Sequence, residues 1–323
     1  MNKGMALSKR QWFLLLSVAS AIISVVAEPI KVLSAEPSAG DGVQQMNIFQ
    51  AFVLGFVQGA TEFLPISSTA HLKVVPVVLG WGDPGVAFTA VIQLGSIAAV
   101  LWYFWSDLTQ LGTGAVKAIA RSDYQDNDFR ITLGILIGTL PIVFCGLLIK
   151  KFIPDFDNSP LRSLGAIAIA SIVMSLLLGI AEKLGTRKRE FSQLNMSDGI
   201  FMGLAQALTV IPGVSRSGST LTAGLFMGLE RATAARFSFL LGMPAITLAG
   251  LVELKDVLGG GLENAGIVPL IVGVVSAGIF SYIAIAGLLR FLKNRSTWVF
   301  IWYRLVFGVL ILGAIGAGLL KNV

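Results

Sequence analysis

Two short polar stretches interrupt a very apolar chain, and both carry side chains that can act on a phosphate group. QGATEFLPISSTAH (58–71) holds a glutamate and the only histidine of the chain, and PGVSRSGST (212–220) holds an arginine among glycines and hydroxyl residues. An acid, an imidazole and a guanidinium are costly inside a membrane unless they share a wet cavity or a ligand. The pattern therefore indicates a functional site within the bilayer.

The second stretch has the parts of an anion-binding cradle. Gly213 and Gly218 permit backbone conformations that point several N–H groups at one spot, and the start of the helix expected after them favours negative charge. Arg216 offers a planar fork that matches two phosphate oxygens. A helix-packing patch, with an arginine that extends to the membrane surface, is the open alternative. The hydroxyl donors here are Ser215, Ser217, Ser219 and Thr220.

The first stretch supplies groups for acid–base and metal chemistry. Gln58 and Glu62 are four residues apart and share one helix face. Glu62 could hold Mg²⁺ or Ca²⁺, or accept a proton. Ser67 and Ser68 are candidate nucleophiles, with a cation-bound water as the alternative, and His71 follows closely enough to act as base or acid. Together with the cradle, these residues predict metal-assisted phosphoryl chemistry on a lipid phosphate that enters sideways from the membrane.

The composition predicts an integral membrane protein. The chain has 323 residues, of which 55% are hydrophobic and only 13% are charged, whereas soluble domains carry about 25% charged residues. The net charge of +6 comes from lysines and arginines in short runs between apolar segments, which is typical of topology signals and not of nucleic-acid binding. One cysteine and one histidine exclude a Cys/His zinc site.

The apolar segments predict an all-α membrane fold. Segments 48–80 and 199–228 are each broken by proline and polar residues, and broken backbone is tolerated only inside protein or beside a wet cavity. We therefore expect two re-entrant helical hairpins besides the spans. Six transmembrane helices are expected at about 86–105, 131–149, 163–180, 232–252, 267–289 and 298–320.

The N-terminus is expected to lie outside the functional fold. Residues 1–45 contain early basic residues, an apolar stretch at Trp12–Val26 and small residues after it, as a signal peptide does. Cleavage and retention as an extra helix both stay open. Residues 46–323 then form the membrane domain, and residue 45 lies outside the cell. With that topology, ten lysines and arginines fall in inside loops against six in outside loops, in agreement with the positive-inside rule.

The two broken segments are related by an offset of 148 residues, which predicts an internal repeat. Each copy, in halves of about 46–184 and 196–320, continues with three spans. Three is an odd number, so the second copy must enter from the opposite face, as in inverted-topology repeats. The two polar turns should then meet near the midplane, with Glu62 and His71 within about 15 Å of Arg216. The matching pairs are Gly55 and Gly203, Gln58 and Gln206, Thr61 and Thr209, and Ser67 and Ser215.

At these residues the sequence resembles the undecaprenyl-diphosphate phosphatase family, also called bacitracin-resistance proteins. GFVQGATEFLPISSTAHL and PGVSRSGSTLTAGLFMGLERATAARFSFLLGMPA are similar to its two motifs, and the resemblance extends from about residue 46 to the C-terminus. It implies that a C55-isoprenyl diphosphate is cleaved to the monophosphate carrier of peptidoglycan synthesis, which affects cell wall, cell shape and bacitracin resistance. It also implies a divalent cation and a site on the outer, periplasmic side of the bacterial plasma membrane.

Carried over by position, the resemblance implies that Glu62 is the essential acid, Ser67 and Ser68 the motif serines and His71 the motif histidine. The phosphate-motif residues are Ser215, Arg216 and Thr220.

Some features fall outside this assignment. Gln58 replaces a glutamate that many family members have, so Glu62 must carry most of the metal or proton role. Arg304 matches a family arginine of unassigned role.

A transporter that flips a lipid phosphate is the alternative function, because inverted repeats with broken helices are common among transporters. Monomer and homodimer both stay open.

Overall fold

The computed structural model describes residues 46–322 apart from short gaps at 82–83, 154–155, 157–158 and 259–265. The signal-like extension at 1–45 lies outside the described residues. Within the described part the chain is helical, with one isolated bridge between Arg189 and Leu229. The α-helices are α2 (Ile48–Glu62), α3 (Ser68–Val78), α4 (Gly85–Tyr103), α5 (Trp105–Ala120), α6 (Asn127–Phe152), α7 (Leu164–Leu184), α8 (Met196–Ala207), α9 (Arg216–Phe226), α10 (Arg231–Leu258), α11 (Ile267–Asn294) and α12 (Trp298–Gly316).

The long helices agree with a multi-pass membrane protein. In the described part of the chain, α6, α7, α10, α11 and α12 are each long and apolar enough to cross a membrane. The first predicted span differs from the expectation, because α4 ends at Tyr103 and α5 continues after a bend of 64°. The sequence becomes polar directly after Trp105, at Asp107, Thr109 and Gln110, so a straight continuation would place these side chains in lipid.

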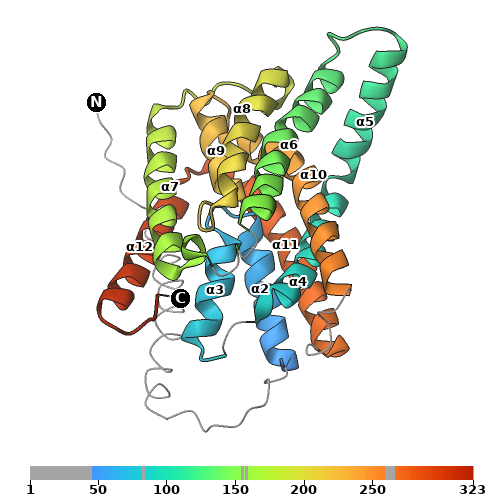
Figure 1. Cartoon of the computed structure of the whole chain (residues 1–323). Helices are drawn as coiled ribbons and strands as arrows, with labels where there is room; N and C mark the ends of the chain where they lie inside the picture. The colour runs from blue at the N-terminus through green and yellow to red at the C-terminus, as the bar shows by residue number, and fades with distance from the viewer. Residues whose placement is uncertain (1–45, 82–83, 154–155, 157–158, 259–265, 323) are drawn as a thin grey trace, which may run out of the picture.

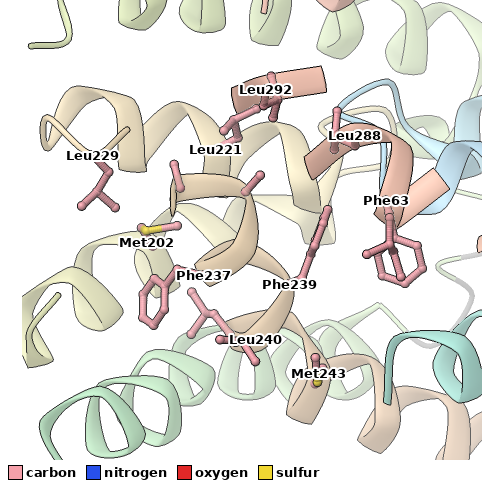
Figure 2. Packing of buried hydrophobic residues seen from close by; sticks show 14 of the residues in the cluster. Phe63, Met202, Leu221, Leu229, Phe237, Phe239, Leu240, Met243, Leu288 and Leu292 are labelled. Carbon is pink, nitrogen blue, oxygen red and sulfur yellow. The ribbon is translucent and has the colours of Figure 1, made fainter. Parts of the chain in front are cut away.

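Many large apolar side chains remain exposed on the outside of the bundle. Phe144 is 61% exposed, Ile169 55% and Val306 52%, which is expected where lipid is the solvent. The interior holds a separate cluster of buried residues, some of which are seen at close range in Figure 2. There the ring of Phe63, next to the first polar turn, lies edge-on to Phe239 of α10 with ring centroids 5.3 Å apart. This contact anchors the first turn in the core.

Two helix–turn–helix pairs hold the polar stretches. In Figure 1, α2 and α3 lie in the lower half of the bundle and α8 and α9 in the upper half. Each pair packs closely on a helix from the other half of the chain. A Cβ on Gly55 of α2 would strike the Gly273 carbonyl of α11, and one on Gly203 of α8 would strike Gly138 of α6. The glycines that correspond at the 148-residue offset thus make corresponding close contacts.

Candidate functional site

The two polar turns are in direct contact. Ser217 Oγ at the start of α9 donates a hydrogen bond of 2.8 Å to the Leu64 carbonyl of the first turn. Arg216 Nη2 lies 3.1 Å from Glu62 Oε1 and forms an ion pair with it. The structure therefore brings together the acid and the guanidinium that lie 154 residues apart in the sequence.

Both turns enter their second helix through the same strained backbone conformation. Ser67 precedes α3 with φ +74° and ψ 98°, and Ser215 precedes α9 with φ +71° and ψ 118°. Non-glycine residues rarely adopt positive φ, and such conformations cost about 1–3 kcal/mol when they do. The Ser215 hydroxyl offsets part of this cost by accepting a hydrogen bond from Gly218 N at 3.2 Å, whereas Ser67 makes no such capping bond. The two serines that correspond at the 148-residue offset thus share an unusual local geometry.

The strain at Ser67 leads to a stability prediction. Ser67→Gly is expected to raise the free energy of unfolding by about 1 kcal/mol, since glycine adopts positive φ without a steric penalty. Ser215→Gly is the matched control, and its gain should be smaller because it also loses the hydrogen bond to Gly218. Thermal unfolding in detergent, followed by tryptophan fluorescence, gives the order of the midpoints. A lower midpoint for Ser67→Gly than for Ser215→Gly would contradict this account.

A cavity of about 480 Å³ lies beside the two turns. Arg216, Lys73 and Arg162 line it, whereas Glu62 is the one acidic residue in its wall as far as the described residues show. Positively charged side chains in a cavity wall suit a multiply charged anion such as a diphosphate. The other polar residues of the wall are Gln58, Ser67, Ser68, Thr69, Thr89, Gln93, Thr209 and Ser215.

Glu62 is the centre of a hydrogen-bonded cluster in this wall. Its Oε2 accepts a bond of 2.6 Å from Ser68 Oγ and one of 3.2 Å from Gln58 Nε2, while Oε1 faces Arg216. The Ser68 hydroxyl proton therefore points at the Glu62 carboxylate.

The Arg216 fork is only half used within the protein. Nη2 pairs with Glu62, but Nη1 is buried and has no hydrogen-bond partner among the described residues. The guanidinium also lies 5.7 Å from the ring centroid of Phe63, which restricts its movement. A buried guanidinium donor without an acceptor is costly. Nη1 lies against Gly242 of α10, so the side chain must turn slightly before this donor can reach a ligand oxygen.

His71 does not line the cavity. Its Nδ1 lies 2.7 Å from the Ser67 carbonyl, and its Nε2 lies 2.6 Å from the Tyr303 hydroxyl of α12. A carbonyl can only accept, so Nδ1 carries a proton, and in the neutral ring Nε2 accepts from Tyr303. Phe307 stacks on the ring with centroids 4.6 Å apart. The structure thus gives His71 a position behind the first turn, where it holds the Ser67 carbonyl, and the proton acceptor next to Ser68 is Glu62.

The predicted cradle is divided between the cavity and the protein interior. Gly213, Ser215 and Arg216 line the cavity, as do Ser67 and Gln58 from the first turn. Ser217, Gly218 and Thr220 do not line it. Thr220 Oγ1 donates to the Arg216 carbonyl at 2.7 Å and lies 2.5 Å from Ser238 Oγ of α10. These hydroxyls are used to fix the turn that presents Arg216.

Arg304 is the residue whose role the sequence did not reveal. Its side chain is fully buried in the centre of α12. Nη1 donates to the Pro65 carbonyl at 3.2 Å, and Nη2 donates to the Gly213 and Val214 carbonyls at 2.8 Å and 3.0 Å. One guanidinium therefore joins the backbones of both turns. The available signal was an arginine in the middle of an apolar span, which is rare enough to indicate a function.

Comparison with known proteins gives the family of this chain. Residues 51–310 match the sequence profile of the family described as bacitracin resistance protein BacA. A protein of a Nostoc species named undecaprenyl-diphosphatase is 74% identical over 319 residues, which cover 98% of this chain and 100% of that protein. A protein of the same name from Gloeobacter violaceus is 55% identical over 280 residues, or 87% of this chain and 96% of that protein. This chain belongs to the bacitracin resistance protein BacA family.

Proposed function

We propose that this chain hydrolyses undecaprenyl diphosphate to undecaprenyl phosphate and inorganic phosphate. The arrangement of Arg216 carries the proposal: one arm of its fork is held by Glu62, and the other is a buried donor without a partner beside a cation-lined cavity. A terminal phosphate is an acceptor that could complete this fork bidentately. Close relatives named undecaprenyl-diphosphatase support the choice of lipid diphosphate over a soluble one. The product is the monophosphate carrier used in cell-wall assembly.

Ser68 and Glu62 are proposed to perform the bond exchange. Ser68 Oγ attacks the terminal phosphorus while its proton passes to Glu62, which it already contacts at 2.6 Å. The bond from phosphorus to the bridging oxygen breaks, and the lipid monophosphate leaves with that oxygen. Water then attacks the phosphorus of the phosphoserine, and the bond from phosphorus to Ser68 Oγ breaks. Glu62 returns its proton to Ser68 Oγ, and the water oxygen with both of its protons leaves as part of inorganic phosphate. Arg216 neutralises negative charge on the transferred group throughout.

A divalent cation, Mg²⁺ or Ca²⁺, is part of the proposal. Glu62, Ser68 and Gln58 place a carboxylate, a hydroxyl and a side-chain amide in one cluster, in which the Gln58 Nε2 group donates to Glu62. Mg²⁺ sites commonly use one or two carboxylates together with substrate phosphate oxygens, so a single glutamate fits when the diphosphate supplies further ligands. The bound cation would contribute charge neutralisation at the phosphates. Gln58 would then serve as a weak ligand or as a hydrogen-bond donor to Glu62.

The membrane arrangement is also proposed. The two helix–turn–helix pairs would be re-entrant hairpins of an inverted-topology repeat, with the site open to the outer face of the plasma membrane. The matching backbone of Ser67 and Ser215 and the reciprocal packing of α2 and α8 support the repeat. The excess of lysine and arginine in the loops assigned to the inside supports the orientation. Homodimer formation stays a prediction, which light scattering of the purified protein would test.

Phosphate release and phosphate labelling test this function. Purified protein in detergent should release inorganic phosphate from undecaprenyl diphosphate when Mg²⁺ or Ca²⁺ is present and should stop when a chelator is added. With substrate labelled on its terminal phosphate, an acid quench in the first turnover should trap label on the wild-type protein and none on Ser68→Ala, because the phosphoserine cannot form.

The outcomes separate the alternatives. Transbilayer movement of lipid phosphate without any phosphate release would indicate the flippase and reject the hydrolase. If phosphate is released but no label is trapped on the protein, and Ser68→Ala still releases phosphate, the chain is a hydrolase whose nucleophile is water and not Ser68. Glu62→Gln should abolish release under either nucleophile, since both depend on the same carboxylate to accept the proton.

A further inference from the structure

A second hollow, of about 1120 Å³, shares no lining residue with the first cavity. The nearest lining residues of the two hollows on α10 are Arg236 and Ala245, nine residues apart, which is about 13 Å along the helix axis. We call the second hollow the basic pocket. Its charged lining residues are Asp107, Arg187, Glu230, Arg231, Arg236, Arg290 and Lys293.

Some of the positive charges of the basic pocket are already paired within the protein. Glu182, which is 3% exposed, binds both Arg187 and Arg231. Arg236 pairs with Asp107 and also lies 4.1 Å from the ring centroid of Phe191. These pairs hold α5, α7 and α10 together around the pocket. They fix the shape of its wall and do not call for a ligand.

The two remaining cations of the basic pocket have no ion-pair partner among the described residues. Arg290 and Lys293, near the end of α11, are exposed and form no ion pair or hydrogen bond with any residue that the structure describes. Leu288 and Leu292 on the same helix are buried in the apolar cluster, where Figure 2 shows both side chains. With five cations against Asp107, Glu230 and Glu182, the pocket keeps two uncompensated positive charges. It therefore favours an anion.

The height of these cations in the bundle indicates the source of the anion. An exposed apolar stripe runs along α11 with four-residue spacing and faces lipid. Arg290 lies 23 residues after Ile267, the first residue of α11, which is about 35 Å along the axis and slightly more than the roughly 30 Å of membrane hydrocarbon. Arg290 thus reaches the level of lipid phosphates. The stripe consists of Ile271, Val275, Ile279 and Ile283, which are 53–57% exposed.

Aromatic side chains near the basic pocket place it at the same interface. Tyr103 and Phe104 line it, and Trp102 and Trp105 beside them are 76% and 66% exposed. Exposed tryptophans at helix ends are typical of the membrane–water boundary. Basic pockets between transmembrane helices at this level bind the headgroups of anionic lipids. A soluble anion would gain the charge contacts but not the contact of acyl chains with the α11 stripe.

We propose that the basic pocket binds the phosphate headgroup of an anionic phospholipid, with the Arg290 and Lys293 side chains as its free cations and the acyl chains along α11. This site is distinct from the proposed hydrolytic cavity and lies at the other end of α10. A bound lipid would bridge α10 and α11, so it should also raise thermal stability.

The test uses the whole purified protein and phosphatidylglycerol as the probe. Bound lipid is counted by native mass spectrometry during titration, with phosphatidylcholine, whose zwitterionic headgroup has no net charge, as the comparison. The variant Arg290→Ala/Lys293→Ala should bind phosphatidylglycerol about 30-fold more weakly, given the usual contribution of each cation near a lipid phosphate. The matched control is Lys117→Ala/Arg121→Ala, which removes two exposed cations of α5 and its end that do not line the pocket. Both variants should keep wild-type phosphate release.

Three results would overturn the proposal. Equal weakening in the control variant would mean that diffuse surface charge attracts the lipid. Unchanged binding in Arg290→Ala/Lys293→Ala would place the lipid elsewhere. A third contrary result would be that millimolar inorganic phosphate displaces phosphatidylglycerol and that phosphatidylglycerol and phosphatidylcholine bind equally well. The basic pocket would then be a site for soluble anions and not for a lipid.

Discussion

Arg216→Ala is expected to lower kcat/KM for phosphate release from undecaprenyl diphosphate by at least about 100-fold, the size of effect seen when one strong charge-stabilising donor is removed. The wild-type side chain has one arm on Glu62 and one buried arm without a partner. Truncation removes both the donor to phosphate and the ion pair that orients the carboxylate. The measurement is steady-state phosphate release by purified variant and wild type at matched cation concentration.

Two further variants define what the Arg216 result means. Arg216→Lys keeps the positive charge but loses the planar fork, so it should recover only part of the activity. Lys117→Ala removes an exposed cation of α5 and should leave turnover unchanged. Near wild-type turnover of Arg216→Ala would reject Arg216 as the phosphate fork. Full recovery in Arg216→Lys would mean that charge alone, without bidentate geometry, is needed.

Arg304→Met is expected to lower the free energy of unfolding by about 3–5 kcal/mol, because three buried carbonyls lose their donor at once. These carbonyls belong to Pro65, Gly213 and Val214, on both turns. Since the turns carry Glu62 and Arg216, loss of the guanidinium should also separate the acid from the fork. Thermal unfolding in detergent gives the stability, and phosphate release at a temperature where the variant is folded gives the effect on the site.

Control variants distinguish a role of Arg304 in positioning the two turns from a general effect on the stability of the fold. Arg295→Met removes an exposed arginine without a recorded side-chain partner in the described part of the chain, and its stability should change by no more than about 0.5 kcal/mol. Arg304→Lys retains one charged donor group and should fold better than Arg304→Met, but with a lowered kcat because it cannot reach both turns. Wild-type stability and turnover in Arg304→Met would show that the two turns meet without this arginine.

Neighbouring residues of each motif have different contacts because of how the helices pack. Arg216 and Ser217 are adjacent in sequence, yet one side chain enters the cavity wall and the other binds the Leu64 carbonyl. Ser68 and His71 both belong to the first motif, yet Ser68 faces Glu62 while His71 contacts Tyr303 of α12. The motif pattern cannot distinguish them, since the partners of Arg216, Ser217 and His71 come from distant parts of the chain.

Several features could be predicted from the sequence because their cause is local or compositional. The long apolar runs required membrane helices, and the polar residues inside two of them required a sheltered turn, because unpaired backbone and charges cannot face lipid. The 148-residue offset between the turns paired Ser67 with Ser215, and these residues share a backbone conformation. The residue types in the turns, together with the offset, were sufficient to predict that an acid and a guanidinium lie close together.

Tertiary structure decided the contacts that no local pattern contains. The position of His71 behind the first turn and the joining of both turns by Arg304 depend on helices that are distant in sequence. A hydrogen bond has a reach of about 3 Å, so its partner is set by how the helices pack and not by spacing along the chain. The sequence alone therefore determined which residues must be sheltered together in the membrane, and only the packed bundle decided which of them face the cavity.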